Sequence, residues 1–225
     1  MNRFARVGRR CPVRIDEMRP VALFTAFACI LASFSTSLLG ETGNVPGGSL
    51  VAWLIHVDVQ HLVIDLLAWL IFGWWLEPRI GSVRLGAWIA AGLSVSICAH
   101  ALLYPHHGVL YGLSAVAFFV FAAGLAAGPG GLSVRCTACG LAVLAFVLAH
   151  ELATGGVTPS RALLGGEALG ERWRLLPVRS GQVGPQPVPL VHVVCAVAGA
   201  GFGLLARMRR SSRTHSLVAL IPHPR

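Results

Sequence analysis

Six long apolar stretches restrict what this chain can fold into more than any other feature. A helix rises about 1.5 Å per residue, so roughly 20 consecutive apolar residues cross the hydrocarbon core of a bilayer. Hydrophobic residues fill 55% of the 225 positions and charged residues only 12%, a balance that one soluble core could not easily hide. The sequence therefore predicts an all-α, polytopic membrane protein with six transmembrane helices, near residues 21–39, 51–76, 85–104, 110–128, 134–153 and 188–207.

Arginine is distributed unevenly around these stretches. Every basic residue is Arg, and the residues before the first stretch and after the last are rich in it. The connections 77–84 and 129–135 carry Arg, whereas 40–50 and 105–109 carry none. Because short cytoplasmic segments of membrane proteins are enriched in basic residues, we expect both termini in the cytoplasm and the chain in a bacterial inner membrane.

One membrane domain is expected at 21–207, between basic cytoplasmic tails at 1–20 and 208–225. The 154–187 segment is predicted to be a long extracytoplasmic loop, since long loops translocate largely regardless of charge. A net charge of +9 could suggest nucleic acid as a partner, but basic tails that flank apolar spans are better explained as anchors at the bilayer surface. The expected partner is therefore the lipid bilayer and not nucleic acid.

The cysteines and histidines were considered as metal ligands. Cys136 and Cys139 form a lone C-x-x-C pair with no second pair near it, which favours packing over metal binding or redox chemistry. No metal site and no cofactor is therefore expected. A small haem or metal membrane protein stays open as an alternative, with ligands drawn from His56, His61, His100, His150 and His192.

Ser114 and His192 are placed at matching depths by the predicted topology. Polar groups at membrane depth are costly, so the few that remain are the first functional candidates. Both residues lie about four residues into spans that run from outside to inside, roughly 6 Å below the outer boundary. A hydroxyl and an imidazole at one depth on parallel helices can serve as nucleophile and general base. We expect them to act as a dyad without a third acid.

The second span carries further polar side chains. His61 and Asp65 are four residues apart, so they share one helical face, and that face could donate hydrogen bonds to a developing oxyanion. Glu77 is expected to form an interfacial cluster with Arg79 and Arg84.

Three motifs in these spans match a known family. The first is the run Ile55-His56-Val57-Asp58-Val59-Gln60-His61-Leu62-Val63-Ile64-Asp65-Leu66-Leu67, followed by Phe72-Gly73 and Leu76-Glu77-Pro78-Arg79-Ile80-Gly81. The second is Gly112-Leu113-Ser114-Ala115, and the third is His192 with the small-residue ridge of Gly199 and Gly203. In this order they resemble the second helix, the Gly-x-Ser-Gly nucleophile motif and the last helix of rhomboid proteases, over roughly residues 50 to 207.

The resemblance implies a six-helix rhomboid-like bundle and the activity of an intramembrane serine endopeptidase. Ser114 would be the nucleophile and His192 the base. The oxyanion or the substrate would be supported by His61, Asp65, Gly112 and His56. The expected substrate is a single-span transmembrane protein.

A narrower resemblance lies around the fifth and sixth spans. The segment His150-Glu151-Leu152-Ala153-Thr154-Gly155, before a Pro-rich stretch, and the segment Val188-Pro189-Leu190-Val191-His192 are similar to the rhombosortase subgroup. That subgroup is associated with cleaving surface or secreted proteins of Gram-negative bacteria. Its substrates carry a C-terminal sorting signal made of Gly-Gly, a transmembrane segment and a basic tail.

Two positions depart from the family pattern. Asp65 stands where rhomboids usually have Asn, and an ionised carboxylate would oppose the charge of an oxyanion. Ala115 replaces the glycine that follows the nucleophile and adds one methyl group. A catalytically inactive rhomboid-like protein that binds membrane helices therefore stays open as an alternative. A transporter is a weaker one, because the sequence shows no internal repeat.

Overall fold

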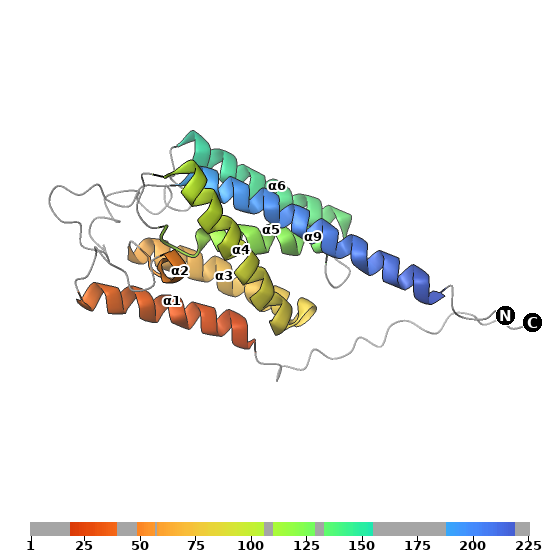
Figure 1. Ribbon diagram of the computed structural model, residues 1–225, viewed down its shortest axis with the longest axis horizontal. Helices are drawn as coiled ribbons and strands as arrows, with labels where there is room; N and C mark the ends of the chain where they lie inside the picture. The colour runs from red at the N-terminus through yellow and green to blue at the C-terminus, as the bar shows by residue number, and fades with distance from the viewer. Residues whose placement is uncertain are drawn as a thin grey trace, which may run out of the picture.

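The computed structural model of the chain describes residues 19–39, 49–56, 58–105, 110–128, 133–154 and 188–218. Most of the predicted 154–187 loop and most of the N-terminal tail lie outside these residues. The described part is all-helical, as predicted. Its helices are α1 (Pro20–Leu39), α2 (Ser49–Ala52), α3 (Val59–Ile80), α4 (Ser82–Leu103), α5 (Ser114–Ala127), α6 (Val134–Ala153) and α9 (Pro189–Val218) (Figure 1).

Four of these helices are long and apolar enough to cross a bilayer, namely α3, α4, α6 and residues Pro189–Arg209 of α9. The apolar Pro20–Ser35 part of α1 and the shorter α5 complete a bundle of six helices. Helix α5 has only 14 residues and buries ten of them. Because α5 packs against α3, α4, α6 and α9, protein covers most of its surface, so it need not match the bilayer thickness by itself.

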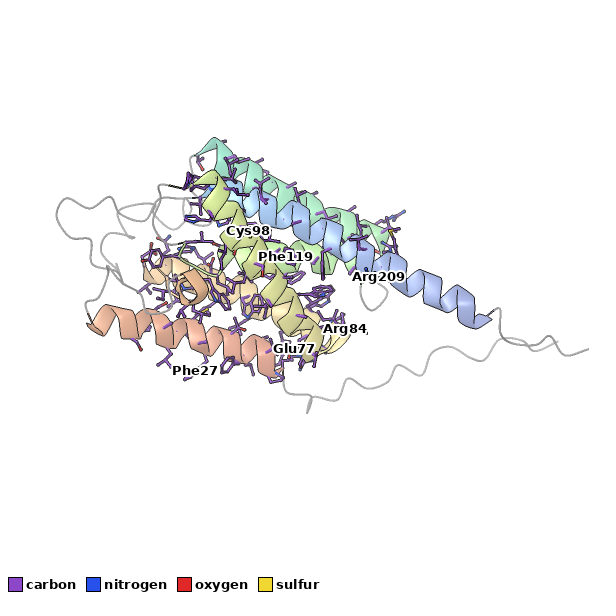
Figure 2. The ribbon with its side chains drawn as sticks, in the orientation of Figure 1. Phe27, Glu77, Arg84, Cys98, Phe119 and Arg209 are labelled. Carbon is purple, nitrogen blue, oxygen red and sulfur yellow. The ribbon has the colours of Figure 1, made fainter. Side chains whose placement is uncertain are left out.

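Helices α5 and α9 pack with their backbones almost in contact. A Cβ atom added to Gly199 would lie 2.2 Å from the carbonyl oxygen of Phe119, and one added to Gly203 would lie 2.2 Å from that of Ala123. Both contacts join residues 80 positions apart, so the two helices run in parallel. Figure 2 shows Phe119 in the middle of the bundle. The glycines therefore allow an approach that any larger residue would prevent.

A buried carboxylate joins α1 to α3. The two carboxylate oxygens of Glu77 accept hydrogen bonds from the backbone N–H groups of Val21, at 3.1 Å, and Ala22, at 2.9 Å. The first turn of a helix has no internal acceptors for its N–H groups, so Glu77 caps α1 from a neighbouring helix. The Ser82 hydroxyl also donates to Glu77, at 2.7 Å. Arg84 lies at the same end of the bundle (Figure 2).

The prediction that Glu77 forms an interfacial cluster with Arg79 and Arg84 is wrong. Only 2% of the Glu77 surface is exposed, and its carboxylate is occupied by the α1 backbone. The Arg79 guanidinium instead lies over the Trp75 ring, with 4.7 Å between the guanidinium carbon and the ring centroid. This is within the roughly 6 Å of a cation–π contact.

The structure also corrects the limits of two predicted spans. The second span was expected at 51–76, but the chain leaves the short α2 after Ala52 and becomes helical again only at Val59. Asp58 ends this interruption, because its side chain accepts a hydrogen bond from the His61 N–H at 2.7 Å and caps α3. Helix α9 likewise continues beyond the predicted end at 207, to Val218.

Candidate active site

Ser114 is the first residue of α5. The fourth span was predicted to begin at 110, about four residues earlier, but Gly112 has a φ of +92° and Leu113 occupies the N-cap position. Leu113 makes no side-chain hydrogen bond to the helix that follows. The N–H groups of the first turn of α5 thus lie beside the Ser114 hydroxyl without a side-chain cap. Such a helix end favours negative charge.

His192 lies in the first turn of α9 and faces Ser114. Its Nε2 atom is 3.0 Å from the Ser114 Oγ atom, within hydrogen-bond distance. The imidazole stacks on Phe118, with 5.0 Å between the ring centroids and 29° between the planes. Only 8% of His192 is exposed. The structure therefore brings together the two side chains that the sequence placed at one depth.

Glu151 contacts the other nitrogen of the same ring. Its Oε1 atom lies 2.7 Å from Nδ1 of His192. In the sequence, Glu151 stands out as a polar residue at the end of the fifth span and as part of the narrower family resemblance, but neither observation gives it a role. The sequence signal for a role of Glu151 is a carboxylate in the last turn of an apolar span, because a charged group at membrane depth requires a partner. Its partner became visible only when α6 and α9 were placed side by side.

His56, Asp65 and His61 form a second polar cluster behind the start of α5. The Asp65 Oδ2 atom is 3.2 Å from Nε2 of His56 and 3.3 Å from Nε2 of His61. His56 is completely buried, and its Nε2 atom also lies 3.4 Å from the Leu113 backbone nitrogen. The Ser33 hydroxyl on α1 accepts a hydrogen bond from the His56 N–H at 3.0 Å. His56 therefore supports the segment before Ser114 from behind.

His61 is the member of this cluster that can meet a substrate, because 31% of its side chain is exposed. A Cβ atom added to Gly112 would lie 3.1 Å from Cε1 of His61 and 3.8 Å from the Ser114 Oγ atom. The His61 ring thus sits beside the nucleophile, with only the bare backbone of Gly112 between them. Ala115 has its methyl group in the hydrophobic core, and 1% of the residue is exposed.

The positions of the remaining histidines bear on the haem or metal alternative. Within the residues that the structure describes, no three His, Cys, Asp or Glu side chains are grouped to hold a metal ion. His100 stacks on Tyr104, and His150 contacts the Phe146 ring. The haem or metal alternative therefore has no grouped set of ligands in the described part of the chain.

Comparison with known proteins identifies a family. The family model of the Rhomboid domain matches residues 47–206, which is most of the chain and includes every site residue above. The chain belongs to the rhomboid family. No curated protein and no solved structure gives a significant match.

Membership places the chain among multi-pass membrane proteins. Rhomboid family members are generally intramembrane serine proteases, although some are inactive. The rhomboid match covers α3, α4, α5, α6 and the first part of α9, so the helices that carry the candidate site are the helices of the family domain.

Proposed function

We propose that this rhomboid is an active intramembrane serine endopeptidase that cleaves single-span membrane proteins with Ser114 and His192. The observation that supports the proposal is the 3.0 Å separation between the Ser114 Oγ atom and Nε2 of His192. In the proposed reaction, Nε2 takes the hydroxyl proton while Oγ attacks a peptide carbonyl of the substrate. Water then releases the acyl group from Ser114.

The negative charge of the tetrahedral intermediate needs donors that are already in place. The N–H groups at the start of α5 supply a positive helix end beside Ser114, and the exposed edge of His61 supplies a side-chain donor. Gly112 leaves the space between them open, because a side chain there would touch the His61 ring. This arrangement favours an active enzyme over an inactive binder of membrane helices.

The proposed orientation follows from charge. Arg19 precedes α1, Arg79 lies near the end of α3 and Arg84 near the start of α4, all at the opposite end of the bundle from Ser114. We place that end in the cytoplasm of a bacterium, by the bias of basic residues towards the inside. The site then opens to the extracytoplasmic face, where water for hydrolysis is available.

The proposed substrate class is a membrane protein with a C-terminal Gly-Gly sorting signal, as the rhombosortase resemblance around His150-Glu151 and Val188–His192 implies. A peptide bond inside a regular helix is not accessible to a nucleophile, because its backbone groups are bonded within the helix. Glycine is unfavourable in a helix by about 1 kcal/mol relative to alanine. Two adjacent glycines would therefore expose a scissile bond at the extracytoplasmic end of a transmembrane segment.

Reaction with a fluorophosphonate probe tests the nucleophile. We expect the detergent-purified protein to be labelled, and the Ser114→Ala and His192→Ala variants to lose labelling. Equal labelling of the parent and Ser114→Ala would overturn the assignment of Ser114. An absence of both labelling and proteolysis in the parent would favour the inactive alternative.

A reporter fusion tests the substrate class. A soluble domain is joined to Gly-Gly, a transmembrane segment and a basic tail, and is co-expressed with the parent or with Ser114→Ala. Release of the reporter only with the parent is expected, and replacement of Gly-Gly by Leu-Leu should prevent it. Equal cleavage of the two fusions would contradict a Gly-Gly preference while leaving the protease assignment intact.

A further inference from the structure

Helix α6 buries a single residue, and that residue is a carboxylate. Glu151 is 2% exposed, whereas apolar side chains of the same helix such as Val143 and Phe146 are about two-thirds exposed, at 64% and 65%. In a bilayer, this helix thus presents its apolar side chains to lipid and its one acid to the protein. Burying a carboxylate is costly unless it is paired. Packing alone therefore does not explain a carboxylate at position 151.

The partner of the acid is the base of the candidate site. Glu151 Oε1 lies 2.7 Å from Nδ1 of His192, a length typical of a charge-assisted hydrogen bond. An ionised carboxylate can only accept, so Nδ1 carries the proton. In the neutral ring Nε2 is then the unprotonated nitrogen, and it is this nitrogen that faces the Ser114 Oγ atom at 3.0 Å.

We infer that Glu151 is a positioning residue for His192, and that the site works as a triad of Ser114, His192 and Glu151 rather than as a dyad. The inference rests on the proposed protease function. The Glu151 carboxylate on α6 keeps the His192 ring in the tautomer and the orientation that can accept a proton from Ser114.

The proton transfers in the attack of Ser114 on the substrate balance without a further reactant. As Ser114 Oγ bonds to the carbonyl carbon, its proton moves to Nε2 of His192, and the ring becomes an imidazolium. Glu151 stays ionised and stabilises that positive charge, while the proton on Nδ1 remains in place. Nε2 then donates its proton to the leaving amide nitrogen as the carbon–nitrogen bond breaks.

One further contact, with Phe118, argues for an oriented His192 ring. The imidazole stacks on Phe118, which restricts its tilt, while the hydrogen bond to Glu151 restricts rotation in the ring plane. The second oxygen of Glu151, Oε2, is buried and has no hydrogen-bond partner among the described residues. An ion pair selected only for stability would satisfy both oxygens, because an unsatisfied buried acceptor is destabilising.

The Glu151→Gln variant tests whether Glu151 positions the His192 ring or only stabilises the fold. Glutamine has the same shape, and its neutral amide removes the charge that must be buried, so the fold should be retained. We expect kcat to fall by up to about 10⁴, the loss seen when an amide replaces the acid of a Ser-His-acid site, with KM changed less than threefold. Glu151→Asp should recover part of the lost kcat. The exposed Cys139→Ser on the same helix is the matched control and should behave as the parent does.

Cleavage activity and the tautomer of the His192 ring are measured in separate experiments. If the parent cleaves and Glu151→Gln retains its kcat within threefold, the inference is overturned while the proposed function stands. If the parent neither cleaves nor reacts with the fluorophosphonate probe, the proposed function fails. Nitrogen-15 NMR of histidine-labelled protein, with His192 assigned through His192→Ala, still decides the tautomer. A proton on Nδ1 in the parent supports the inference, and a proton on Nε2 alone overturns it.

Discussion

The hydroxyl of Ser114 lies 3.0 Å from Nε2 of His192, although 78 residues separate them in the sequence. The contact depends on two parallel helices whose backbones nearly touch. Ser114 begins α5, His192 lies in the first turn of α9, and the glycines of α9 set the distance between the two helix axes. The chemistry of the site is thus coupled to helix packing one to three turns deeper in the bundle.

Gly199→Ala should impair both stability and activity. The added Cβ would lie 2.2 Å from the carbonyl oxygen of Phe119 and 2.9 Å from its carbonyl carbon, and these backbone atoms cannot rotate away. Separating the helices should cost about 1–3 kcal/mol of unfolding free energy. A shift of about 1 Å between nucleophile and base should lower kcat about 100-fold. Thermal unfolding in detergent and reporter cleavage measure the two effects.

Gly201→Ala is the control for this experiment, because a Cβ atom there would meet no atom within 4 Å. It should leave both unfolding and cleavage close to those of the parent. Similar losses in Gly199→Ala and Gly201→Ala would contradict the role of the close contact between α5 and α9, because alanine is the better helix former at both positions.

Gly112→Ala should lose activity out of proportion to its loss of stability. The φ of +92° at Gly112 is strained for any residue with a Cβ atom, at a cost of about 1–3 kcal/mol. In addition, the new methyl group would press on the His61 ring beside Ser114. Gly81 has a similar φ of +87° and open space around it. Gly81→Ala should therefore lose similar stability and keep its kcat, and equal kcat values for the two variants would contradict a role of Gly112 in the site.

Asp65→Asn should keep or raise kcat. Asp65 contacts both His56 and His61 through one oxygen, and an amide of the same shape can maintain both contacts. It also removes a negative charge that would oppose an oxyanion near His61. Asp65→Ala should instead lower both kcat and the unfolding temperature, because two histidines lose their partner. A kcat for Asp65→Asn as low as that for Asp65→Ala would show that the charge itself is required.

Glu77→Ala should destabilise the fold while leaving the site chemistry unchanged at permissive temperature. The carboxylate accepts hydrogen bonds from the N–H groups of Val21 and Ala22 and from the Ser82 hydroxyl. Its loss should lower the unfolding free energy by about 3 kcal/mol, the cost of leaving such donors unsatisfied. Glu77→Gln should fall between the parent and Glu77→Ala. An unchanged unfolding temperature in Glu77→Ala would contradict its role as the cap of α1.

The general architecture could be predicted from the sequence because hydrophobicity is a local property. The six apolar stretches predict six helices, and most of their limits differ from the structure by only a few residues. The rhomboid motifs also pointed to the family that the domain match shows. The larger errors are at the starts of α3 and α5 and at the end of α9. Asp58 delays the start of α3, and Gly112 and Leu113 delay the start of α5, because capping and positive φ override a continuous apolar pattern.

The sequence by itself determined that this chain is a helical membrane protein and that Ser114 and His192 occur at comparable depth. Only the tertiary structure decided that Ser114 begins its helix, that Glu77 caps α1, and that Glu151 meets His192. The physical reason is that a buried polar group is stable only when another group satisfies it. That partner can lie 41 residues away for His192 and Glu151, or 55 for Glu77 and Ala22, and no local pattern identifies it.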